Sequence, residues 1–187
     1  YDTSGLLQFA KRAGGTGLDF GTGIAADSSG NSYVTGYFRD APATFAPGEA
    51  NQTILTSAGA EDIFVAKYNA TGAVVWARRA GGPSDDRGFG IALDGARNSY
   101  VTGRFAQTAT FGPGEPNQTM LTSANNFDIF VAKYAGGLFC PSDSLQAAVN
   151  GASPGETINV TGTCVENILI RNDKVRVFLN GGGTATI

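Results

Sequence analysis

The chain has 187 residues, a formal net charge of −3 and no histidine. The lack of histidine excludes Ser-His-Asp and Cys-His catalysis and every His-ligated metal site. The absence of clustered Lys and Arg argues against a nucleic-acid partner. No apolar run approaches the roughly 20 residues of a membrane helix, so no membrane span is expected.

The composition favours β structure. Gly, Thr, Ser and Asn are abundant and only 16% of the residues are charged. This balance is typical of a β-rich protein with many tight turns.

The first fifteen residues align with residues 68–82 at an offset of 67. Tyr1 to Gly15 therefore predicts a strand that belongs to a preceding or swapped blade of a repeat. The strands and turns predicted after it, in chain order, are a small-residue strand at 23–27, a turn at 27–31, a strand at 32–38, an excursion through 44–56, a strand at 63–68, a turn at 70–72 and a strand at 74–79. In the first turn, Asp27 is expected to accept backbone N–H bonds and Gly30 to supply a positive φ.

A second copy of this pattern follows. Residues 62–68 return unchanged as 128–134, and Asp94 takes the place of Asp27. Four strands plus an inserted hairpin per unit favour a propeller blade over a solenoid rung. One departure is the pair Ala96-Arg97, which stands where the first copy has Ser29-Gly30, so a different turn geometry is expected there.

These motifs resemble the bacterial SBBP family of β-propeller repeats. The resemblance covers residues 1–134 and includes Gly23-Ile24-Ala25-Ala26-Asp27, Asn31 to Gly36, and Asp62 to Tyr68. It implies an all-β fold for a first domain, residues 1–136, made of two repeats. It also implies a secreted or surface-exposed protein that is a scaffold or binding surface.

The pattern changes in a second domain, residues 137–187. A short helix is expected to start at Ser142 and to end at Gly151. Short Ile/Val-rich strands follow at 157–160, 167–170 and 175–179. Residues 140–187 resemble the helix-capped start of a pectin-lyase-like right-handed parallel β-helix. Cys140 and Cys164 predict a disulfide, with two unrelated buried thiols as the alternative.

Several side chains are candidates for a site, each with a structural alternative. Asp27 and Asp94 are expected to be turn residues more than calcium ligands. Asp85-Asp86-Arg87 is expected to be a solvated loop, with a glycan contact as the alternative. The aromatic residues Phe9, Tyr33, Phe64, Trp76, Tyr100 and Phe130 are expected between blades, with a sugar platform as the alternative.

Two further residue sets carry weaker predictions. Glu61, Asp62 and Asp128 could pair for glycoside chemistry, although equivalent repeat positions favour a structural role for the two aspartates. The acceptor pattern for N-glycosylation occurs at four asparagines, Asn51, Asn69, Asn117 and Asn159.

The sequence predicts a non-enzymatic, secreted structural protein, extracellular or at the cell surface, without a cofactor. Two blades cannot cover their own sheet edges, so subunits are expected to complete each other's sheets through open β edges and ends, in the extreme as a filament. The alternatives are a fragment of a larger surface adhesin or glycan-binding protein, and an enzyme similar to polysaccharide lyases.

Overall fold

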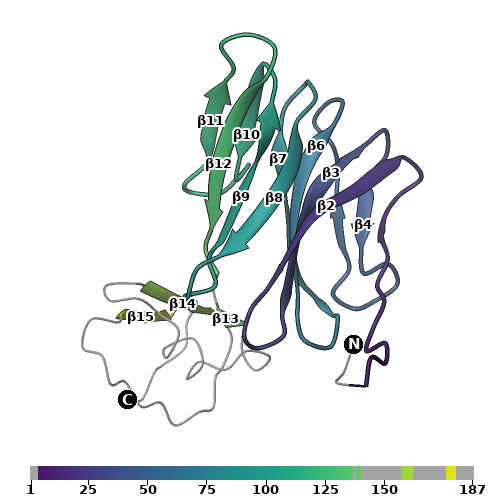
Figure 1. Ribbon diagram of the computed structural model, residues 1–187. Coiled ribbons are helices and arrows are strands. Elements are labelled where there is room, and N and C mark those ends of the chain that lie inside the picture. The colour runs from purple at the N-terminus through teal and green to yellow at the C-terminus, as the bar shows by residue number, and fades with distance from the viewer. Residues whose placement is uncertain (1–3, 137, 140–156, 162–175, 180–187) are drawn as a thin grey trace.

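The computed structural model describes residues 4–136, 138–139, 157–161 and 176–179 (Figure 1). Within these ranges every regular element is a β-strand, and none is a helix able to cross a membrane. The all-β prediction is confirmed.

Blade 1 is an antiparallel sheet of four strands. In spatial order these are β2 (Leu18–Ala26), β3 (Ser32–Arg39), β6 (Asp62–Tyr68) and β7 (Val74–Gly81). The four strands follow one another across the sheet in chain order, from β2 to β7, which we call the outer strand. Strand β2 begins five residues before the predicted strand and carries a bulge between Gly21 and Gly23. Gly36 faces this bulge, and a Cβ there would lie 1.8 Å from the Phe20 carbonyl oxygen, so only glycine fits.

Blade 2 repeats this arrangement with three strands among the described residues. These are β8 (Arg87–Leu93), β9 (Ser99–Phe105) and β12 (Asp128–Tyr134), in the order β12-β9-β8. The bulge recurs between Gly88 and Gly90. A strand equivalent to β7 does not follow β12 in the described part of the chain, which leaves one edge of β12 without a strand partner.

Each blade also carries an inserted hairpin, which we call a strap. Strap 1 is β4 (Ala43–Phe45) with β5 (Thr53–Leu55), and strap 2 is β10 (Thr108–Phe111) with β11 (Thr119–Thr122). Strap 2 leaves its own blade and pairs with β7 of blade 1, whereas strap 1 pairs with β1 (Ala13–Gly14) in the same way. A strap therefore joins each blade to the outer strand that precedes it.

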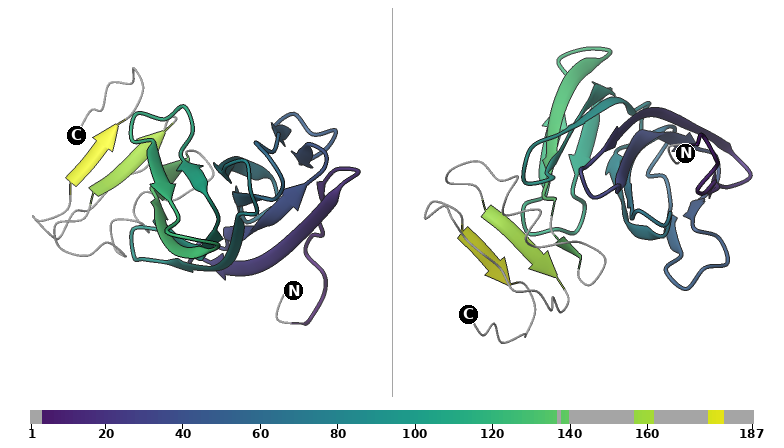
Figure 2. Two further views of the ribbon diagram at one scale, coloured as in Figure 1. Left: turned by 90° about the horizontal axis from the view of Figure 1, so that it is seen from above. Right: turned by 60° about the horizontal axis from the view of Figure 1, so that its bottom comes forward.

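The two blades lie side by side (Figure 2), and their side chains share a core. Ile63 and Val65 of blade 1 pack in one cluster with Val101, Phe105 and Phe130 of blade 2. A second cluster, which includes Phe38, Phe45 and Phe64, lies on the opposite side of blade 1 under strap 1. We call the side of a blade that carries Phe38 and Phe64 in blade 1 its leading face. The opposite side, which carries Ile63 and Val65 in blade 1 and packs on the next blade, is its trailing face.

The described part of the tail is a small sheet of a different kind. Strands β13 (Leu138–Phe139), β14 (Thr157–Thr161) and β15 (Arg176–Leu179) pair in parallel. Two of the predicted tail strands are confirmed as β14 and β15. The predicted helix at 142–151, the strand at 167–170, and Cys140 and Cys164 lie outside the described residues.

Candidate functional site

The trailing face of blade 2 is the clearest candidate surface, because an identical sequence is buried in blade 1. Ile63 and Val65 of β6 are fully buried, whereas Ile129 and Val131 of β12 are 83% and 73% exposed. The sequence of the two strands is the same, so the difference arises from their surroundings. Burying one such side chain contributes about 1.5–3 kcal/mol. The trailing face of blade 2 therefore retains the apolar character of a blade-to-blade contact without a blade against it.

The polar part of this face also matches the buried face of blade 1. Lys67 Nζ lies 5.5 Å from the ring of Tyr33, and Lys133 Nζ lies 5.1 Å from the ring of Tyr100. Lys67 and Tyr33 are fully buried, while Tyr100 is 36% exposed. A hydrogen bond to Tyr100 raises the pKa of Lys133. This cation–π pair is preformed in the open blade.

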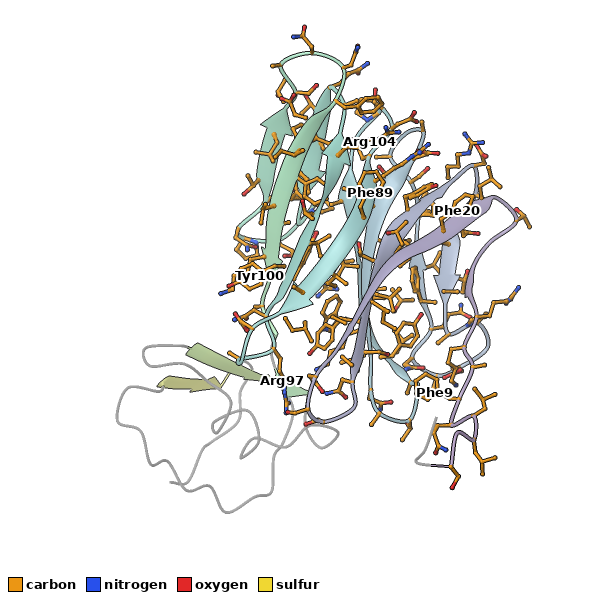
Figure 3. The ribbon with its side chains drawn as sticks, viewed as in Figure 1. Phe9, Phe20, Phe89, Arg97, Tyr100 and Arg104 are labelled. Carbon is orange, nitrogen blue, oxygen red and sulfur yellow. The ribbon has the colours of Figure 1, made fainter. Side chains whose placement is uncertain are left out.

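An arginine and two aromatic rings extend the trailing face near the other end of the strands. The Arg104 guanidinium lies 4.1 Å from the ring centroid of Phe127 and 6.0 Å from that of Phe89. Both rings are about half exposed, and Phe89 and Arg104 lie near each other in Figure 3. Such partly exposed aromatic and arginine side chains are enriched at protein interfaces.

The leading face of blade 1 is open and apolar as well. It carries a hollow of about 330 Å³ whose lining includes Phe9, Ile24, Val34, Phe38 and Phe64. Ile24 is 70% exposed, although its counterpart in blade 2, Ile91, packs against the shared core. The chain thus presents two unsatisfied faces that correspond to the two sides of its own blade-to-blade contact.

A wider groove runs beside the free edge of β12. It has a volume of about 810 Å³, and its lining includes Trp76 and Arg78 of β7, Leu121 of β11, and Val131 and Tyr134 of β12. Burial raises the pKa of Tyr134. The groove has the position that the fourth strand of blade 2 would occupy.

Arg97 joins the two blades at their turns, which the sequence did not predict. Its Nη2 donates to Ser29 Oγ at 2.6 Å, and its Nε lies 3.4 Å from Asp27 Oδ2 with both side chains almost fully buried. The turn itself matches the first copy, since Arg97 has φ 64° where Gly30 has φ 79° and both turns close with the same backbone hydrogen bonds. The expectation of a different turn geometry was wrong, because Arg97 adopts the left-handed conformation of glycine.

The two turn aspartates have the predicted structural role. Asp27 accepts hydrogen bonds from the N–H groups of Ser29 and Asn31, and Asp94 accepts one from the N–H of Asn98. Their oxygens are therefore engaged by the turns.

Asp86 is buried, so the expectation of a solvated loop at this position was wrong. It accepts hydrogen bonds from the N–H of Gly82 at 2.7 Å and from the N–H of Ala106 at 3.0 Å. Burial raises its pKa to about 6, in spite of these hydrogen bonds, and the charges of Asp62 and Asp85 add to the rise. Asp86 ties the end of β7 to the corner between β9 and β10, and the adjacent Arg87 pairs with Glu61.

The remaining candidate carboxylates each contact a partner of their own. Asp62 accepts from Ala58 N–H and pairs with Arg79 at 3.1 Å, and burial raises its pKa. Asp128 accepts from Ala124 N–H. Glu61, directly before β6 of blade 1, is bound to Arg87 at the start of β8 in blade 2, so this ion pair joins the two blades. The contacts of the two aspartates hold loops to strands, as their equivalent repeat positions indicated.

The aromatic residues divide according to whether a neighbouring blade is present. Tyr33, Phe64 and Phe130 are buried between elements, whereas Phe9 and Tyr100 are each 36% exposed. Trp76 packs against the shared core. Phe130 lies in the core shared by the two blades, whereas Phe64 lies under strap 1 on the leading face of blade 1.

The predicted glycosylation sites differ in their surroundings. Asn51 donates through Nδ2 to the Val74 carbonyl, and Asn69 accepts from the N–H groups of Thr71 and Ala73 in the turn between β6 and β7. Asn117 is exposed, and Asn159 lies in β14, whose side chains are outside the described set.

Comparison with known proteins supports the propeller repeat. The SBBP family, described as a beta-propeller repeat, matches residues 8–37 and 75–104. The second match starts in β7 and ends in β9, and the first starts at residue 8, before β1, and ends in β3. An uncharacterized WD repeat-containing protein of Acanthamoeba polyphaga mimivirus is 27% identical over 139 residues, which are 72% of this chain. The chain spans 10% of the length of that relative. No solved structure matches.

Proposed function

We propose that this chain is a non-enzymatic structural module that associates with further copies of itself, the trailing face of one copy packing on the leading face of the next. The observation that carries the proposal is the identical strand that is buried in blade 1 and open in blade 2. The contact between blades 1 and 2 is a template for the contact between copies, because both faces repeat its residues. We further propose an extracellular or cell-surface location, which rests on the family resemblance.

The proposal is tested by a charge on the trailing face. Ile129→Glu should reduce the protein to a monomer, because the contact would bury an unpaired carboxylate. Folding should be unaffected, since the side chain is 83% exposed. Sedimentation velocity over a range of micromolar concentrations measures the association.

A matched control is available on strap 2. Met120 is 63% exposed even though its strap is already paired with β7, so Met120→Glu should leave association unchanged. A monomeric parent protein over the whole concentration range would refute the proposed function.

A second candidate is favoured by the relation to the longer viral relative. The same two blades could form a section of a larger surface adhesin or glycan-binding protein, with the open faces covered by further blades of that polypeptide. The intact mass of the protein from its native source, compared with 19.2 kDa for this chain, distinguishes the candidates.

We also propose that the tail begins a parallel β-helix. The parallel register of β13, β14 and β15 supports this proposal. Hydrogen exchange tests it: amides of β14, the middle strand, should exchange more slowly than those of β15, and equal rates would contradict a stacked sheet.

A further inference from the structure

The N-terminal segment repeats the outer strand of blade 1. Residues 6–14 align with residues 73–81 at the offset of 67, so that Phe9 corresponds to Trp76 and Arg12 to Arg79. Residues 74–81 form β7, which lies between β6 of its own blade and strap 2 of the next blade.

The contacts of this segment show that it already acts as an outer strand on one side. Lys11 Nζ pairs with Glu49 of strap 1 at 2.6 Å, and the corresponding Arg78 Nε pairs with Glu115 of strap 2 at 3.1 Å. Strand β1 pairs with β4 in the same register in which the end of β7 pairs with β10. The strap side of this outer strand is therefore complete.

The other side of the segment is open. Residues 7–12 are exposed and belong to no strand in the described part of the chain, whereas β7 pairs along its length with β6. Strand β12, which is identical in sequence to β6, has the complementary vacancy. The segment and β12 lie on opposite sides of the molecule, so one chain cannot join them (Figure 1).

We infer that residues 6–14 of one copy form the fourth strand of blade 2 of another copy, antiparallel to β12. This inference rests on the proposed function and specifies its contact. The register of β7 on β6 transfers directly: Ala77 opposite Ala66 becomes Ala10 opposite Ala132. The inserted strand lies in the groove beside β12, and its chain continues into the blade that covers the trailing face.

Two side-chain contacts identify this register. Arg12 takes the place of Arg79, whose Nη1 lies 3.1 Å from Asp62, and so meets Asp128. Arg12 and Asp128 form no ion pair within the described residues. Asn117 takes the place of Asn51 and so donates to the carbonyl of Leu7, as Asn51 does to that of Val74.

The first experiment is a disulfide cross-link in the full chain. Ala10→Cys with Ala132→Cys should give covalent multimers on a non-reducing gel after mild oxidation. The control is the out-of-register pair Ala10→Cys with Ala135→Cys. It should give no multimers, because Ala135 lies three residues along the chain from Ala132, the predicted partner of Ala10.

The second experiment is a charge exchange measured by sedimentation. Arg12→Glu and Asp128→Arg should each weaken association at least about tenfold, and the double variant should recover it, because a partly buried charge pair is lost and then restored. The cross-link does not depend on the folding of Asp128→Arg.

The outcomes separate this inference from the proposed function. Multimers without the specific cross-link and without recovery in the double variant would overturn the strand insertion while leaving self-association intact. A parent protein that never associates would overturn both.

Discussion

At the scale of single residues, Arg97 shows how a turn can be adapted to join two blades. Its backbone has φ 64°, which costs roughly 1–2 kcal/mol for a residue with a side chain. Its guanidinium, in return, lies between Ser29 and Asp27 of the neighbouring blade. Breaking a buried ion pair costs about 3–5 kcal/mol, so the bridge outweighs the backbone strain.

We therefore expect Arg97→Gly to destabilise the protein by about 1–4 kcal/mol, although glycine suits the turn. The loss has two causes: Asp27 remains buried without its cation, and the two turns are no longer joined. Urea unfolding measures the change in free energy.

The control is Gln107→Gly, which replaces another left-handed residue whose side chain is exposed. It should be neutral or slightly stabilising. An Arg97→Gly variant as stable as the parent would show that the bridge contributes nothing.

At the scale of elements, the repeat itself predicted most of the first domain. Two copies of one pattern give each strand twice, and the turns at Asp27 and Asp94 fix where the first strands end. Blade 1 and the two straps follow from this reading.

The partners of the straps could not be predicted from the sequence. A hairpin pattern predicts its own two strands, but Thr110 and Phe111 pair with Gly81 and Ala80 of the previous blade. This choice depends on the placement of whole sheets, for which a local pattern carries no information.

The buried charges were missed for a similar reason. Asp86 stands in a run of charged residues, Asp85-Asp86-Arg87, that is typical of a solvated loop. Its burial arises because two separate backbone N–H groups, from Gly82 and Ala106, converge on its carboxylate. The sequence did carry one signal, because an aspartate, Asp19, stands at the equivalent position of the first repeat. In the structure Asp19 likewise accepts a hydrogen bond from a backbone N–H, that of Gly15.

At the scale of the whole molecule, the two open faces are different surfaces, so the contact between copies is heterologous. Ile24→Glu blocks the leading face and Ile129→Glu blocks the trailing face. Each variant alone should be monomeric, but an equimolar mixture should form pairs and nothing larger, because one good face remains on each chain. Sedimentation of the mixture measures this.

The mixture also tests the symmetry of the contact. An isologous dimer, in which the same patch meets itself, would not be rescued by mixing the two variants. If the heterologous contact of the parent closes, about three or four copies would supply the six to eight blades of a common propeller, and if it does not close the product is a fibre.

The straps have a consequence for the order of folding. The end of β7 gains its second partner only when β10 has been synthesised, well after blade 1 itself. During synthesis, each blade would therefore leave the ribosome with its last strand paired on one edge only. The strap of the next blade would then pair with the other edge. Blades linked in this way should melt together as a cooperative unit, with each added neighbour raising the stability of the one before it.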